Sequence, residues 1–130
     1  MSEEPGLVTE WRALAQRYHE ISCALERELQ ERHGLGMSEF EVLDQLATTD
    51  HGKLRMLELA DLVHLSQSAL SRAVARLERG GLVCRALCEQ DRRGVFVTLT
   101  DEGRTRQEQA RPTQRAVLSE SLVGNRPTGG

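Results

Sequence analysis

The sequence predicts a mainly α-helical domain with one small β-hairpin, an α+β fold. Apolar residues recur every three or four positions over most of the chain, which is the spacing of a buried helix face. Between residues 95 and 100, the aliphatic residues Val95, Val97 and Leu99 alternate with Phe96, Thr98 and Thr100, which is the period of two expected of a strand. A chain of 130 residues with 38% hydrophobic and 28% charged residues has the size and balance of a single globular domain.

The first predicted helix is long and ends near His33, before Gly34 and Gly36. Its apolar residues fall on one stripe, which consists of Leu7, Trp11, Leu14, Tyr18, Ile21, Leu25 and Leu29. A single helix cannot bury such a stripe on itself. We therefore expect residues 1–36 to pack against the rest of the domain or against a second chain.

Two shorter helices are predicted next. Ser38 and Glu41 have the S-x-x-E spacing of a capping box, which predicts a helix start at Ser38. This helix ends at the turn formed by residues 50–52. A third helix spans roughly Met56–Leu65.

The fourth predicted helix follows Ser66, a favoured N-cap residue, and runs from Gln67 to Arg79. Gly80 and Gly81 end it. Only a tight turn at residues 65–66 separates the third and fourth helices, so the pair is predicted to form a helix-turn-helix. Such a motif places its second helix in the major groove of DNA.

The fourth helix has a polar face outside its apolar stripe. Its members are Gln67, Ser68, Ser71, Arg72 and Arg76. Glutamine can bond adenine, and arginine can bond guanine, through two hydrogen bonds each. This face is therefore predicted to contact DNA bases, and the alternative is an ordinary solvated helix face.

The hairpin is predicted from strands at Leu82–Cys88 and residues 95–100, joined by a polar turn at Glu89–Gly94. The turn contains Asp91, Arg92 and Arg93. An arginine presented beside a recognition helix can enter a narrow minor groove, and an aspartate can orient its guanidinium. The alternative is an exposed turn whose charges only solubilise it.

Thr100 is the predicted N-cap of a last helix that begins near Asp101 and continues past Pro112. The tail at residues 124–130 is rich in Gly, Pro and Thr and is expected to be disordered.

Charge is distributed unevenly along the chain. Residues 1–65 contain 6 basic and 13 acidic side chains, a net charge of −7. Residues 66–130 contain 11 basic and 7 acidic side chains, a net charge of +4. This asymmetry favours a polyanion-binding face in the second half. Lys53 is the only lysine, so nearly all of the positive charge is arginine, and the alternative explanation of this composition is codon bias in a GC-rich genome.

Five segments of the sequence carry a recognisable pattern, namely Leu59–Ala60, Ser66–Arg72, Leu77–Val83, Asp91–Arg93 and Val97–Arg104. Together they resemble the MarR family (multiple antibiotic resistance regulators). The combination of the D-x-R tip and the L-T-x-x-G motif at this spacing is specific, whereas either motif alone is weak.

The resemblance implies a winged helix-turn-helix with flanking dimerisation helices. Residues 37–100 would form the DNA-binding region, and residues 1–36 and 101–123 the dimerisation helices. A homodimer would read a pseudo-palindromic operator in double-stranded DNA. Most members of the family repress transcription, and many release DNA when a small aromatic or phenolic effector binds between the dimer and DNA-binding regions.

Two positions depart from the family pattern. Leu57 stands where members usually have a Ser or Thr that caps the third helix. Members of the family normally finish with a further long helix that completes the dimer interface, whereas here the predicted helix at 101–123 is followed by a tail that contains Gly and Pro. We therefore expect the dimer to rest mainly on the first helix and residues 102–122.

Other candidate sites lie on the first helix. Trp11, Tyr18 and His19 could line an effector pocket, and the alternative is core or dimer packing. His19 and Cys23 are four residues apart and share a face, so Cys23 could act as a redox-sensing thiol, with ordinary packing as the default. No metal is expected, because neither C-x-x-C nor H-x₃-H spacing occurs.

The sequence contains no G-x-S-x-G, Walker, H-E-x-x-H or dinucleotide-binding motif, so neither an enzyme nor a cofactor is expected. It has no apolar run of about 20 residues and no basic signal-peptide start, which predicts a cytoplasmic protein with no membrane partner. A winged-helix module that binds protein instead of DNA is the remaining alternative. Arg72 and Arg76 on the recognition face argue against it.

Overall fold

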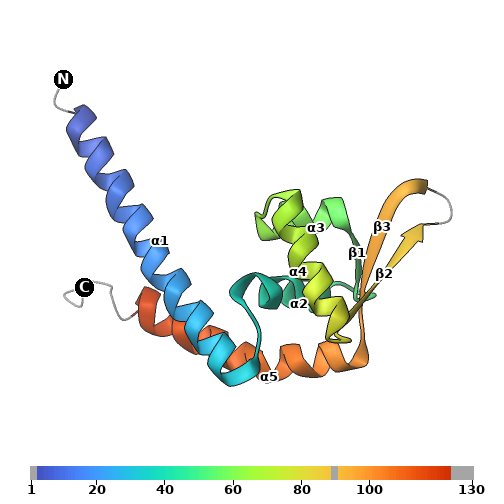
Figure 1. The fold of residues 1–130 in the computed structure, drawn as a ribbon. Helices are drawn as coiled ribbons and strands as arrows, with labels where there is room; N and C mark the ends of the chain where they lie inside the picture. The colour runs from blue at the N-terminus through green and yellow to red at the C-terminus, as the bar shows by residue number, and fades with distance from the viewer. Residues whose placement is uncertain (1–2, 89–90, 124–130) are drawn as a thin grey trace.

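A computed structural model describes residues 3–88 and 91–123, except for the side chains at positions 3, 88 and 91–93. The described chain is mostly helical with a small antiparallel sheet, which confirms the predicted fold class (Figure 1). Its elements are α1 (Glu3–His33), α2 (Met37–Thr48), β1 (Lys53–Arg55), α3 (Met56–Val63), α4 (Gln67–Arg79), β2 (Val83–Cys88), β3 (Asp91–Leu99), α5 (Asp101–Leu118) and the π-helical turn η1 (Ser119–Val123). The tail predicted to be disordered, 124–130, lies outside the described residues. None of the described helices is long and apolar enough to cross a membrane.

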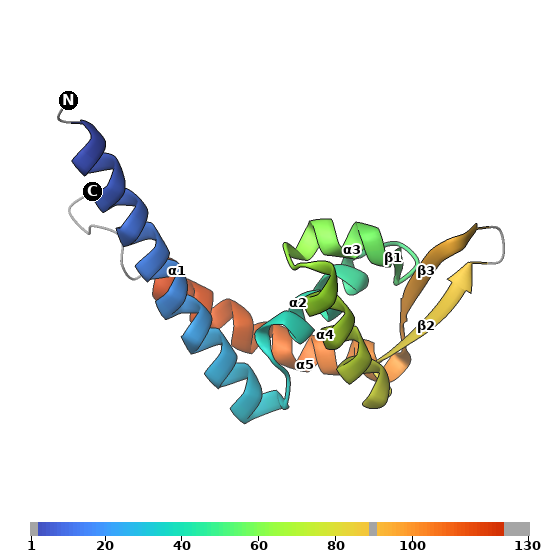
Figure 2. The same ribbon diagram turned by 45° about the horizontal axis from the view of Figure 1, so that its top comes forward.

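Helix α1 is covered over only part of its length. Leu25 and Leu29 in its C-terminal half are buried in the core. In its N-terminal half, the residues of the apolar stripe are 62–68% exposed, namely Leu7, Trp11, Leu14 and Tyr18. This half projects away from the other elements (Figures 1 and 2).

The N-cap of helix α2 lies two residues before the predicted N-cap Ser38, and the predicted capping box was wrong. The N-cap is Gly36, whose backbone N–H donates to Glu39 Oε1 over 2.7 Å. Glu39 thus occupies the third helical position, from which a carboxylate can reach back to the N-cap amide. Ser38 and Glu41 lie inside the helix instead.

The sequence analysis missed strand β1. This strand of three residues pairs with β3 at the edge of the sheet, with Leu54 opposite Val97. Helix α3 follows directly. It starts at Met56, where Glu58 Oε1 accepts a hydrogen bond from the Arg55 N–H over 2.9 Å, so Leu57 does not act as the cap.

The helix-turn-helix is formed as predicted. Helix α3 ends at Val63, two residues before the predicted end, because His64 adopts a left-handed conformation with φ of 56°. Ser66 is the N-cap of α4, and its Oγ accepts from the Ala69 N–H over 3.1 Å. Both ends of α4 agree with the prediction.

The sheet has the order β1-β3-β2, and β3 is longer than predicted. Residues 91–94, predicted as turn, belong to this strand, because the ladder with β2 continues to Cys88 opposite Asp91 across a register shift. Of the predicted turn, residues 89–90 lie outside the description.

Helix α5 begins as predicted, with Thr100 Oγ1 accepting from the Gly103 N–H over 3.0 Å, and it continues through Pro112. Gly103 packs closely against Leu82, in the segment that joins α4 to β2. A Cβ at this position would overlap the Leu82 carbonyl oxygen.

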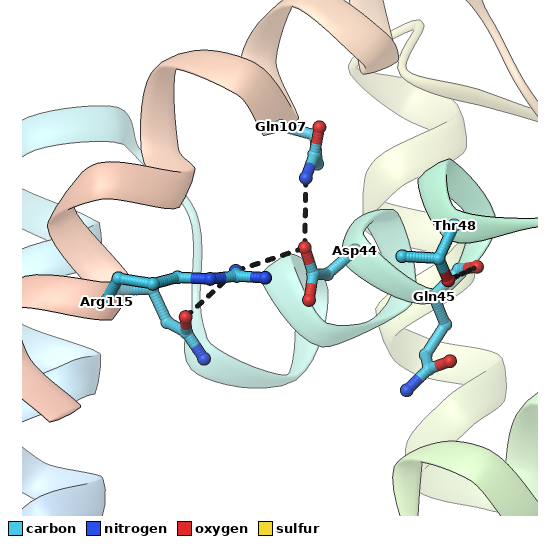
Figure 3. Close-up of polar contacts among 6 residues, drawn as sticks. Asp44, Gln45, Thr48, Gln107 and Arg115 are labelled. Atoms are coloured by element: carbon cyan, nitrogen blue, oxygen red, sulfur yellow. Dashed lines mark hydrogen bonds and ion pairs between the residues drawn. The ribbon is translucent and has the colours of Figure 1, made fainter.

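Polar contacts fasten α5 to the preceding helices. Asp44 on α2 accepts hydrogen bonds from Gln107 Nε2 at 2.9 Å and from Arg115 Nη1 at 3.2 Å (Figure 3). His33 Nε2 lies 2.7 Å from Thr113 Oγ1, which links α1 to α5. Helix α5 is thus joined to both α1 and α2.

Candidate nucleic-acid interface

Helix α4 has a buried side and an exposed side, as its sequence pattern predicts. Its inner residues Leu70, Ala73, Val74 and Leu77 are at most 1% exposed. The five residues predicted to contact DNA are all exposed, namely Gln67, Ser68, Ser71, Arg72 and Arg76. The N–H groups at the N-terminus of a helix can attract phosphate.

Arg76 differs from the other exposed residues of α4 because it forms an ion pair. Its Nε lies 3.5 Å from Glu39 Oε2, and its side chain is 47% exposed. Glu39 is nearly buried and also accepts from the Gly36 N–H. One carboxylate therefore caps α2 and holds α4 against it.

A second ion pair joins α4 to the hairpin. Arg85 on β2 binds Glu78 Oε1 through both Nε and Nη2 at 3.0 Å, and its backbone N–H donates to Oε2 at 3.3 Å. These contacts fix the base of the hairpin relative to α4. The sequence analysis singled out neither Glu39 nor Glu78, because their partners lie on other elements.

Strands β2 and β3 extend past the helices as a wing (Figure 2). Asp91, Arg92 and Arg93 lie in β3, but their side chains are outside the described part of the structure. The predicted Asp91–Arg93 pairing and the groove contacts of this tip therefore stay predictions.

A hollow of about 490 Å³ separates the wing from the start of α4. Gln67 and Ser71 line it from α4, and Arg85 lines it from the wing. Arg55, at the junction of β1 and α3, lines it as well. The hollow thus has a basic rim beside two of the predicted base-contacting residues.

Further positive charge lies at the base of the wing. Lys53 Nζ lies 4.3 Å from the centroid of the Phe96 ring, and the Arg55 guanidinium carbon lies 5.3 Å from it. Cations over an aromatic face are held by the ring quadrupole. The sequence analysis missed this pair because it did not predict β1.

A separate cavity of about 560 Å³ lies between α1, α2, α5 and the turn that precedes α4. Of the three predicted effector residues, Tyr18 lines it, whereas Trp11 and His19 are not among its lining residues. Most of the other lining side chains are apolar, including Ile21, Leu25 and Leu118.

Glu41 also lines this cavity and is half-buried. Burial raises the pKa of its carboxyl group, and the nearby Asp44 carboxylate raises it further, while Arg115 and His64 act in the opposite direction. Glu41, predicted to belong to a capping box, lies inside α2.

Cys23 is exposed, and its Sγ lies 3.6 Å from His19 Nε2 on the same face of α1. Within residues 3–88 and 91–123, no group of three or more His, Cys, Asp or Glu side chains could hold a metal ion.

The fold and the exposed face of α4 beside a wing define a class, the winged helix-turn-helix DNA-binding proteins. A sequence profile described as MarR family matches residues 33–94. An HTH-type transcriptional regulator of Bacillus cereus is 34% identical over 103 residues, which cover 79% of this chain and 67% of the relative. The HTH-type transcriptional repressor MdtR of Bacillus subtilis is 30% identical over 95 residues, which cover 73% of this chain and 60% of MdtR.

Among solved structures, Sco3205 from Streptomyces coelicolor, a MarR family transcriptional regulator crystallised in complex with DNA, superimposes with a TM-score of 0.85. It is 32% identical, and the match covers 98% of this chain and 78% of Sco3205. The chain belongs to the MarR family. It is a DNA-binding transcriptional regulator and not an enzyme.

Proposed function

We propose that this chain represses transcription as a homodimer that binds a pseudo-palindromic operator. The observation that carries the proposal is the exposed polar face of α4, held in place by the Glu39–Arg76 and Glu78–Arg85 ion pairs. The name of the relative MdtR supports repression, and the DNA complex of Sco3205 supports a duplex target. A chromosomal operator implies action in the cytoplasm.

Each recognition unit would contact DNA at three places. Gln67, Ser68, Ser71 and Arg72 would meet base edges in the major groove. Arg93, supported by Asp91 and accompanied by Arg92, would enter the neighbouring minor groove. The hollow with its basic rim lies between these two regions, where the phosphate backbone that separates the grooves would pass.

The exposed apolar side of α1 supports the homodimer. Large apolar residues exposed in a row mark an interaction surface rather than a solvated one. Leu122 and Val123 of η1 are also exposed, 43% and 57%, and would extend the same contact. Two-fold symmetry would then place two copies of α4 on a palindromic site.

Genomic selection tests the proposal. Purified protein is incubated with fragments of its own genome, and the bound duplexes are sequenced and footprinted. We expect an inverted repeat whose half-site centres lie about 10 base pairs apart, or a multiple of that distance. Enrichment of a single unrepeated half-site, or of no sequence, would contradict the proposal.

The cavity between α1, α2 and α5 is the proposed effector site. Its volume lies within the roughly 300–1,000 Å³ of small-molecule pockets. Its lining includes Val63, His64 and Leu65, which lead directly into α4. A ligand that moves this turn would change the position of α4, and so its fit to DNA.

A thiol-sensing regulator that uses Cys23 is a second candidate, supported by the exposed Sγ and the His19 contact. In that case, peroxide would lower the operator affinity of the wild-type protein and leave Cys23→Ser unaffected. Equal peroxide sensitivity of both proteins would exclude Cys23 as the sensor.

A further inference from the structure

The lining of the cavity between α1, α2 and α5 includes a carboxylate, that of Glu41, which has no ion-pair partner among the described residues. Glu41 projects from α2 into the cavity lining. It makes no hydrogen bond or ion pair with any residue within 3–88 and 91–123. A half-buried carboxylate without a partner has lost hydration that nothing in the described protein replaces.

The charged groups nearest to Glu41 do not balance it. Arg115 is the nearby cation, and it is engaged by Asp44 Oδ1 at 3.2 Å and by Gln114 Oε1 at 3.0 Å (Figure 3). Because Asp44 and Arg115 compensate each other, the negative charge of Glu41 remains. Tyr18 and His64 are the other titratable side chains that line the cavity.

We propose that the effector of this protein is a cation with an apolar body, a protonated amine or a quaternary ammonium compound, whose charge is placed against Glu41. The proposal rests on the proposed function of this cavity as the effector site. Tyr18, Ile21, Leu25 and Leu118 would surround the apolar part of the ligand. An anionic aromatic acid of the same size would be repelled by the Glu41 carboxylate and is a poor ligand for this cavity.

The test compares two probes of opposite charge by isothermal titration calorimetry, without DNA. The cation is benzyltriethylammonium and the anion is 4-tert-butylbenzoate. At about pH 8, we expect the full-length protein to bind the cation at least tenfold more tightly than the anion. Failure to bind the cation, or equal or tighter binding of the anion, would overturn the proposal.

Substitutions at Glu41 test whether its negative charge causes the preference for the cation over the anion. Glu41→Gln has nearly the same shape without the charge and is expected to weaken cation binding about tenfold. Glu41→Asp keeps the charge and is expected to retain the preference for the cation. The matched control is Glu108→Gln, an exposed position on α5 outside the cavity lining, which should bind as the wild type does. Undiminished cation binding by Glu41→Gln would overturn the proposal.

The outcome is distinguishable from failure of the proposed function. DNA binding by the probe-free protein is measured separately by fluorescence anisotropy. A protein that fails to bind any duplex contradicts the regulator, whereas the calorimetric comparison still decides the ligand class.

Discussion

At the residue scale, two carboxylates outside the predicted DNA-contacting face, those of Glu39 and Glu78, hold α4 in its position. Glu39 accepts from the Gly36 N–H at 2.7 Å and pairs with Arg76 at 3.5 Å. Glu78 performs the equivalent role toward Arg85 on the wing. Arg76 is therefore a residue that positions the helix as well as a predicted DNA contact.

Graded substitution of Glu39 separates its two contacts. Glu39→Gln can still accept from Gly36 but loses the ion pair, which involves a half-exposed arginine, so we expect the free energy of unfolding to fall by only about 0.5–1 kcal/mol. Glu39→Ala also loses the hydrogen bond that caps α2, so its free energy of unfolding should fall by about 1 kcal/mol more than that of Glu39→Gln. Urea unfolding at one fixed protein concentration measures both. Equal losses in the two variants would contradict the dual role.

Arg72 provides the sharpest test of base reading. It is exposed and central on the predicted face of α4. We expect Arg72→Ala to weaken operator binding by about 1–3 kcal/mol and binding to random duplex much less. Arg111→Ala on α5 is the matched control, because it removes one exposed arginine away from α4. Equal losses on operator and random DNA would show that Arg72 contacts phosphate.

The polar face of α4 could be predicted from the sequence because helical periodicity separates inner from outer residues locally. The partners of Glu39 and Glu78 could not, because the chain brings them together only through packing between elements. Glu41 was misassigned for a related reason. A capping-box pattern is met by more than one pair near a helix start, and local sequence does not decide between them.

At the element scale, the helices and the wing hairpin were predicted, and the edge strand was not. Strand β1 has three residues and is defined by pairing with β3, more than 40 positions later. Such a short segment has no period that a sequence pattern can reveal. The extra residues of β3 were likewise hidden, because polar side chains suit an exposed wing strand as well as a turn.

Gly103, at the start of α5, is the position where we expect a single substitution to destabilise the fold most clearly. An alanine Cβ there would overlap the Leu82 carbonyl oxygen, so the start of α5 would have to shift. We expect Gly103→Ala to lower the free energy of unfolding by about 2 kcal/mol or more. Gly80→Ala is the control. Its Cβ would meet nothing closer than 3.6 Å and its φ is −82°, so it should change stability by less than about 1 kcal/mol. Similar melting behaviour of both variants would contradict this packing.

At the scale of the whole molecule, two features remain open to a partner. The N-terminal half of α1 exposes apolar residues on one side, and α4 exposes a polar and basic face at the other end of the fold (Figure 1). Asp44, Arg115 and His33 connect the elements between them. This arrangement suits a dimer whose flanking helices set the separation of two recognition helices.

A charge placed in the apolar stripe tests the dimer. Leu14 is 62% exposed, so Leu14→Glu should leave the isolated fold intact while it weakens dimerisation by about 2 kcal/mol or more. Thr9→Glu, on the opposite side of α1 at 100° per residue, should not affect association. Sedimentation velocity at micromolar concentration measures both. A dimer undisturbed by Leu14→Glu would place the interface elsewhere.

The central claim is that α4 and the wing bind duplex DNA with sequence preference. Fluorescence anisotropy with the selected operator and a scrambled duplex, at salt concentrations from about 50 to 200 mM, tests it directly. We predict affinities for both duplexes that fall steeply with salt, and an operator preference of at least about 10³-fold throughout. Equal affinity for the two duplexes, or no salt-sensitive binding to either, would contradict it.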